Sequence, residues 1–107
     1  MIRVTTPTHT FTLPMETSDC SEIQVTYKQG KVSVVKHYQD GVLPSGMSLD
    51  GDDVMVRLTQ EETKQFKATL PAEAQVRVLT LGGDAYASQI FKVTVGEVLN
   101  EGVLADA

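Results

Sequence analysis

Three aspartates in one short turn have the closest spacing for metal chemistry in this sequence. Asp50, Asp52 and Asp53 surround Gly51, and calcium binds carboxylate oxygens from closely spaced acids. The calcium loop of a helix-loop-helix site requires D-x-[DN]-x-[DN]-G and a distal Glu, and this segment does not provide that spacing. Asp and Gly are also ordinary residues of hairpin turns, so we predict a turn that holds no metal.

The side chains that could bind a metal through nitrogen or sulfur are spread along the chain. His9, His37 and Cys20 have no paired spacing, and a structural zinc site needs four ligands. A reactive Cys20 would need a basic neighbour, whereas Asp19 and Glu22 lie beside it. The sequence contains no G-x-S-x-G elbow and no phosphate-binding glycine loop with its lysine. We therefore predict a protein that is not an enzyme and that binds no cofactor or metal.

Tyrosines are the side chains that could stack on sugar rings. The chain has three of them, Tyr27, Tyr38 and Tyr86, but no Trp, and aromatic residues make up only 6% of the sequence. Such a platform would be sparse. We predict that Tyr27 packs in the core and that the other two lie on strand surfaces.

Charge and length limit the possible partners. Nine basic residues are scattered among fourteen acidic ones in 107 residues, and binding to phosphate depends on clustered Lys and Arg. We predict no nucleic-acid partner and, for the same reason, no anionic membrane partner. One cysteine excludes an internal disulfide, and no apolar stretch near the start resembles an export signal. We expect synthesis in the cytoplasm, from which an assembled particle could carry the protein outside.

Apolar residues recur at every second position in short runs that end at Gly, Pro, Asp or Ser, which is typical of half-buried strands. Thr59 and Glu62 match a capping box, which predicts a short helix over 60–67 with Phe66 holding it to the core. We predict strands at 9–13, 22–28, 31–38, 47–49, 54–58, 73–81 and 85–95. Seven strands with one helix between the fifth and sixth fit an all-β, immunoglobulin-like sandwich.

The sandwich is predicted to span residues 1–96, with residues 97–107 as an apolar C-terminal tail. Four large apolar residues lie in this tail: Val98, Leu99, Val103 and Leu104. Each could contribute roughly 1.5 to 3 kcal/mol if fully buried. They could fold back over an open end of their own sandwich, or they could reach another subunit by strand addition or by filling a groove. These four residues are our candidate interface.

Four stretches of the sequence, all in its second half, carry a resemblance. Residues 58–63 with Phe66, then 75–80, 83–88 and 95–104 resemble small uncharacterised proteins encoded in phage and prophage genomes of Gram-positive bacteria. They are more loosely similar to the β-sandwich N-terminal domains of upper baseplate proteins in long-tailed phages. The resemblance implies a virion or morphogenesis component near the tail, baseplate or connector.

Two functions follow from these observations. The first is a phage structural or assembly protein that docks to copies of itself or to other phage tail proteins, without catalysis, and that ends in the virion. The alternative is a carbohydrate- or cell-surface-binding module whose ligand loops would be 39–46 and 50–53. Self-association, if present, is expected to give symmetric rings.

Overall fold

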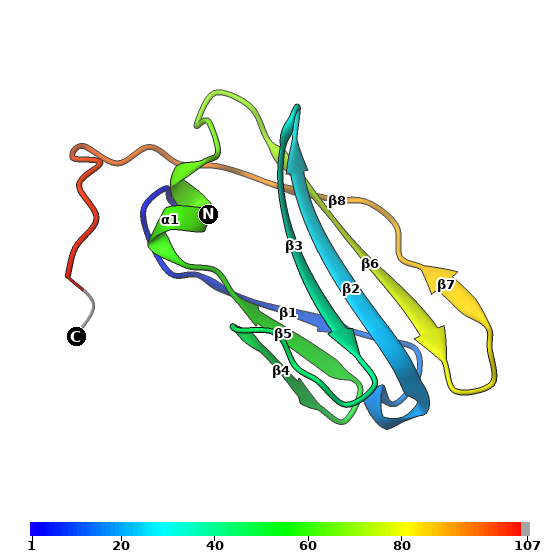
Figure 1. The fold of residues 1–107 in the computed structure, drawn as a ribbon. Coiled ribbons are helices and arrows are strands. Elements are labelled where there is room, and N and C mark those ends of the chain that lie inside the picture. The colour runs from blue at the N-terminus through cyan, green and yellow to red at the C-terminus, as the bar shows by residue number, and fades with distance from the viewer. Residues whose placement is uncertain (106–107) are drawn as a thin grey trace.

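Two antiparallel β-sheets pack face to face in the computed structural model, which describes residues 1–105 (Figure 1). This part of the chain contains eight strands, one α-helix and one 3-10 turn, η1 (Thr17–Asp19). The prediction of an all-β domain with one short helix is confirmed. No helix within residues 1–105 is long and apolar enough to cross a membrane.

The first sheet has three strands in the order β1-β5-β4, with β1 at Thr8–Thr12, β5 at Asp53–Arg57 and β4 at Met47–Asp50. Its central strand alternates as predicted, because Val54 and Val56 are completely buried. The acidic turn closes the β4–β5 hairpin, and Gly51 provides its positive φ of 60°.

The second sheet is larger and follows the order β3-β2-β6-β7, with β8 also paired to β6. Its central strands are β2 (Cys20–Gln29) and β6 (Ala72–Thr80), and β3 (Val32–Gln39) forms one edge. Ile23, Val25 and Tyr27 of β2 are fully buried against the first sheet. The core therefore consists of the inward positions that the alternation predicts.

The opposite edge of this sheet differs from the single return strand predicted at 85–95. It is split into β7 (Ala85–Ala87) and β8 (Phe91–Val93), both paired to β6. Ser88 interrupts the ladder because its hydroxyl accepts a hydrogen bond from Val76 N–H at 3.0 Å while its own N–H donates to Val76 O at 2.8 Å. The two strands consequently pair with β6 in registers that differ by one residue, as at a β-bulge.

Helix α1 (Gln60–Lys64) begins at the predicted capping box. Glu62 N–H donates to Thr59 Oγ1 at 3.1 Å, and Thr59 N–H donates to the Glu62 carboxylate at 2.8 Å. The second oxygen of Glu62 lies 2.8 Å from Lys36 Nζ of β3. Phe66, just beyond the helix, has no solvent exposure. The helix is thus anchored to the core and to the second sheet.

The immunoglobulin-like arrangement is not confirmed. In constant-type immunoglobulin domains the second and third strands lie in opposite sheets, whereas β2 and β3 form a hairpin within one sheet here. The strand count is eight rather than seven because the last strand is split.

Candidate functional site

An apolar groove lies between β1 of the first sheet and β7–β8 of the second. Its volume is about 750 Å³, and it is also bordered by Leu13, Pro14 and Met15 after β1 and floored in part by Val76 and Val78 of β6. We take this groove as the candidate functional site because apolar concavities are the usual binding sites of proteins.

Two unpaired strand edges border the groove. In the described chain, β1 pairs only with β5, and β7 and β8 pair only with β6. The alternation of an antiparallel ladder turns the backbone N–H and C=O groups of Thr8, Thr10 and Thr12 toward the free edge of β1. Free strand edges of this kind can pair with a further strand.

Aromatic side chains from both edges meet across the groove. The ring centroids of Phe11 and Phe91 are 5.9 Å apart, and Phe11 also lies against Tyr27 at 6.5 Å. Phe91 remains 36% exposed and Tyr86 remains 53% exposed. These rings close the sandwich only partly, so apolar surface is left open to solvent.

His9 lies on the inner face of β1 and links the groove to the core. Its Nδ1 is 2.7 Å from the hydroxyl of Tyr27, a fully buried side chain. Burial lowers the pKa of His9, and the positive N-terminal amino group lowers it further. Burial raises the pKa of Tyr27, with a smaller effect from Glu62. The hydrogen bond therefore joins a neutral imidazole and a neutral phenol.

Acidification should destabilise the protein through His9. Because the pKa is lower in the folded state, the unfolded state binds more protons as pH falls through the ordinary histidine pKa of about 6.5. Stability from this group is complete above that pH and declines below it. We expect the melting temperature to fall between about pH 7.5 and 5.5. In His9→Gln the fall should be smaller, and an identical pH profile for both proteins would contradict this account of His9.

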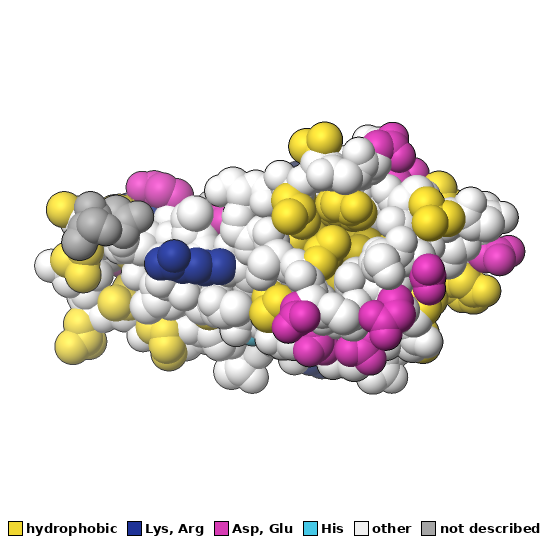
Figure 2. All heavy atoms as spheres, turned by 90° about the horizontal axis from the view of Figure 1, so that it is seen from below, with side chains coloured by type: hydrophobic (Ala, Val, Ile, Leu, Met, Phe, Trp, Pro, Cys, Tyr) yellow, Lys and Arg dark blue, Asp and Glu magenta, His cyan; other side chains and the backbone are white. Residues whose placement is uncertain are grey.

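Negative charge is concentrated at one end of the groove. Hydrogen bonds bring the end of β1 and η1 beside the β4–β5 turn, and bring Asp19 beside Leu81. The segments that meet here, 13–22, 39–41, 49–54 and 79–85, contain no Lys or Arg. They hold eight of the fourteen acidic residues: Glu16, Asp19, Glu22, Asp40, Asp50, Asp52, Asp53 and Asp84. Figure 2 shows acidic side chains gathered in the right-hand half of the face seen from below, and we call this region the acidic end.

The C-terminal tail leaves its apolar side chains in solvent. Leu99 is 106% exposed, Leu104 is 75% exposed and Val103 is 43% exposed, whereas Val98 is half-buried. Polar contacts hold the tail backbone: Gln60 of α1 donates to Leu104 O at 3.1 Å and accepts from Leu104 N–H at 2.9 Å. Leu99 and Leu104 therefore stay largely in solvent, while Val103 and Leu104 border a hollow beside β5 and α1 of their own domain.

Arg3 joins the tail to the rest of the domain. Its Nε donates to Phe66 O at 2.5 Å and its Nη2 donates to Lys64 O at 3.0 Å, so it satisfies carbonyls at the end of α1. Its Nη1 pairs with Glu97 at 2.7 Å and also with Glu101. The tail position is thus fixed by charge and hydrogen bonds.

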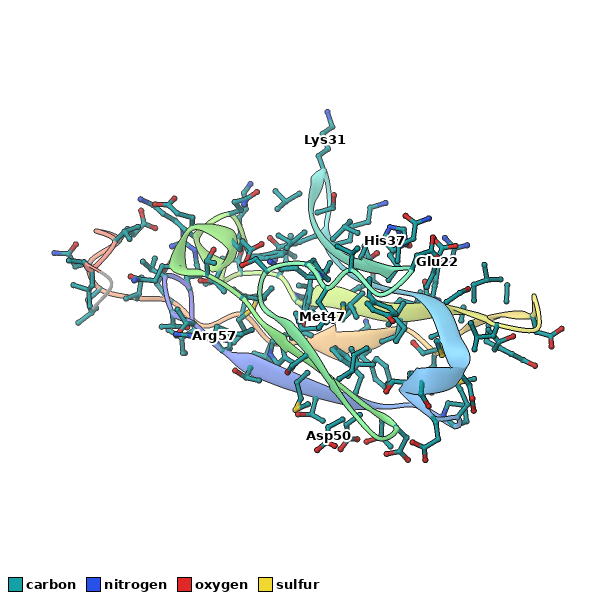
Figure 3. The ribbon with its side chains drawn as sticks, turned by 60° about the horizontal axis from the view of Figure 1, so that its bottom comes forward. Glu22, Lys31, His37, Met47, Asp50 and Arg57 are labelled. Atoms are coloured by element: carbon teal, nitrogen blue, oxygen red, sulfur yellow. The ribbon has the colours of Figure 1, made fainter. Side chains whose placement is uncertain are left out.

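The residues considered for metal chemistry remain apart. Among residues 1–105, no three His, Cys, Asp or Glu side chains are grouped to hold a metal ion. Asp50 lies at the tip of the β4–β5 hairpin, and His37 pairs with Glu22 at 2.9 Å on the second sheet (Figure 3). Cys20 is buried, and both burial and the charge of Asp19 raise its pKa.

The tyrosines form no common surface. Tyr27 is in the core as predicted, and Tyr38 is partly buried against the core. Tyr86 lies exposed on strand β7, as predicted, and borders the groove. The loops named for carbohydrate binding therefore gain no aromatic platform from these three residues.

Sequence reasoning identified the tail but not the groove. The groove left one sequence signal, which is the break in apolar alternation around Ser88, before Phe91.

Comparison with known protein families, curated proteins and solved structures finds no match to this chain.

Proposed function

We propose that this chain is a non-enzymatic structural or assembly protein that docks to copies of itself and to neighbouring proteins. The observation that carries this proposal is the apolar groove between two free strand edges, with Phe91 and Tyr86 exposed in it. Exposed contiguous apolar surface marks interaction sites in proteins. The exposed tail is a second apolar surface with the same implication.

The virion setting is supported by the sequence resemblance to phage and prophage proteins. We propose that the protein is made in the host cytoplasm and becomes part of the tail, baseplate or connector. Neither nucleic acid nor a membrane is a proposed partner, because the basic residues are too scattered to bind phosphate groups.

The test is the solution mass of the full chain by size exclusion with light scattering, from about 1 to 200 µM, a range suited to micromolar association. We expect an oligomer whose mass rises with concentration, and a lower mass for a version that ends at Gly96. The melting temperature should change only slightly on truncation, because the large side chains removed are mostly exposed. A full chain that stays monomeric throughout would contradict the proposed self-association.

A further inference from the structure

We infer that the groove binds an extended segment of a neighbouring protein, which pairs with the free edge of β1 as a fourth strand of the first sheet. This segment has apolar side chains at alternate positions and Lys or Arg at its N-terminal end. The inference rests on the proposed function and names the kind of partner that the groove takes.

One strand position beside β1 is vacant. The first sheet is three strands wide, whereas the second is four strands wide because β7 and β8 share its last position. The groove lies where the narrower sheet ends, with β1 as one wall, β7–β8 as the other and Val76 and Val78 of β6 in its floor. A strand added to β1 would therefore cover the part of the second sheet that the first sheet leaves open.

The backbone of β1 can pair with such a strand. Leu13 N–H donates to Asp52 O at 2.7 Å, and Leu58 N–H donates to Pro7 O at 3.0 Å. Bonds toward β5 thus involve the odd-numbered residues of this segment, and the N–H and C=O groups of residues 8, 10 and 12 point to the free edge. A peptide strand would bond to these groups and fill the groove at once, whereas a lipid chain would contact only the apolar walls.

The groove requires an apolar side chain at every second position of its partner. Side chains alternate across a strand, and on β1 the rings of His9 and Phe11 lie against Tyr27 of the core while the three threonines are exposed. The five residues of β1 span roughly 17 Å. In an added strand of this length, the inward side chains would lie over the apolar floor and beside Phe91 of the opposite wall.

Negative charge at one end of the groove favours a basic residue in the partner. At the C-terminal end of β1, Asp53 accepts a hydrogen bond from Thr12 Oγ1 at 2.7 Å, and Glu16 directly follows the last groove residue on that side. Asp84 lies in the β6–β7 turn, beside the opposite wall. Because the acidic end contains no Lys or Arg of its own, a partner cation would be the counter-ion of these carboxylates.

Positive charge at the other end gives the partner its direction. Arg57 pairs with Thr8 at the start of β1, and the N-terminal amino group donates to Thr94 O at 2.6 Å, next to Val93 of the groove. Both strand pairs of the first sheet are antiparallel, and an added strand of the same kind would begin at the acidic end. The basic residues of the partner therefore lie near its N-terminus.

Segments of this chain do not fit that description. Residues 93–107 contain acidic residues but no Lys or Arg, and the tail backbone is held by Arg3 and Gln60 of its own domain. The free-edge strand β3 includes a lysine, but Val34 and Lys36 are buried in their own domain. We therefore assign the added strand to a different protein and not to a second copy.

The test is a titration of the isotope-labelled full chain with the synthetic peptide acetyl-Lys-Lys-Thr-Val-Thr-Val-Thr-Val-Thr-amide, followed by backbone amide chemical shifts. Peptide concentrations up to about 2 mM detect millimolar affinity. The largest shifts and slowed hydrogen exchange should occur at the amides of Thr8, Thr10 and Thr12. Two control peptides, one with Ser in place of Val and one with Glu-Glu in place of Lys-Lys, should each bind at least about tenfold more weakly.

Two blocking variants locate the binding site in the full chain. Thr10→Pro removes the central N–H of the free edge, where proline is tolerated because no ladder bond is lost, and should abolish binding, whereas Thr10→Ser should keep it. Tyr86→Ser alters the opposite wall, where Tyr86 is 53% exposed, and leaves β1 unchanged. It should weaken binding at least about threefold. Circular dichroism and melting temperature check that each variant is folded.

A further pair of variants tests the charge. The double variant Glu16→Gln, Asp53→Asn should weaken binding of the lysine peptide about three- to tenfold, the effect of losing two exposed ion pairs. Glu61→Gln is the matched control, because Glu61 is an exposed carboxylate of α1 outside the groove. Raising the salt concentration from about 0.05 to 0.5 M should weaken binding to the unmodified chain through screening.

Three results would overturn the inference. If the lysine peptide leaves the amides of residues 8, 10 and 12 unchanged, or binds both folded blocking variants as it binds the unmodified chain, the groove takes no strand. If the Glu-Glu peptide binds equally well, charge does not select the partner. If the same amides shift when the protein alone is concentrated, a second copy covers the groove. Light scattering of the protein alone tests the proposed self-association separately, so that proposal can stand when this inference fails.

Discussion

Replacing Phe66 with alanine should lower the free energy of unfolding by about 3–5 kcal/mol, the cost of removing a large buried aromatic side chain. Phe66 is fully buried and lies directly after α1, where its backbone carbonyl accepts a hydrogen bond from Arg3. Its loss would leave a cavity at the place where the helix joins the core. Urea unfolding followed by circular dichroism would measure the change.

Leu70→Ala is the matched control because Leu70 lies in the same connection and is 56% exposed. It should change stability by less than about 0.5 kcal/mol, as most surface substitutions do. Comparable losses for the two variants would mean that Phe66 does not anchor the helix as described.

Replacing Gln29 with leucine should cost about 2–4 kcal/mol, because three hydrogen bonds to the connection after α1 are lost together. The Gln29 amide nitrogen donates to Lys67 O at 2.9 Å and to Leu70 O at 2.7 Å. Its oxygen accepts from Lys67 N–H at 2.7 Å. Leucine has a similar size but cannot satisfy these backbone groups.

Two further variants separate this role from simple packing. Gln29→Glu keeps the acceptor for Lys67 N–H but turns a carboxylate oxygen toward Lys67 O and Leu70 O, so at neutral pH it should be at least as destabilising as the leucine variant. Gln65→Leu, at an exposed glutamine of the same connection, should be nearly neutral. Limited proteolysis should cut residues 65–71 faster in Gln29→Leu, and equal rates would argue against a role in holding this segment.

The ion pair between Glu62 of α1 and Lys36 of β3 makes the stability of the protein depend on pH in the acidic range. Burial alone raises the pKa of Glu62, but hydrogen bonds from Lys36 and Thr59 outweigh it, and the net pKa is lowered. A lowered carboxyl pKa gives stability that is present above the unfolded value of about 4.3 and is lost as pH falls through the folded value. This contribution therefore disappears at lower pH than that of His9.

Local sequence was sufficient for most strands and for the start of the helix. The alternation of Ile23, Val25 and Tyr27 predicted the buried face of β2, since side chains alternate across a strand whatever pairs with it. The capping box at Thr59 and Glu62 was predicted because its hydrogen bonds join residues only three apart. The acidic turn at 50–53 was predicted because its Asp and Gly residues favour a turn through contacts within a few residues.

The candidate site depended on contacts that are remote in sequence. Phe11 and Phe91 meet only because β1 and β8 lie at the facing edges of two different sheets. Alternation predicts which face of a strand is buried but not which strands remain unpaired at an edge. The predicted immunoglobulin-like strand order is not confirmed, because β2 and β3 pair within one sheet.

The sequence by itself determined an all-β domain, its capped helix and an apolar tail that includes Leu99 and Val103. Only the tertiary structure decided that an apolar groove opens between β1 and β7–β8, that eight acidic residues gather at its end, and that Leu99 and Leu104 of the tail stay largely in solvent. The physical reason is the range of the interactions. Strand alternation and helix capping act over a few residues, whereas sheet order, edge exposure and charge clustering arise from pairings between distant segments.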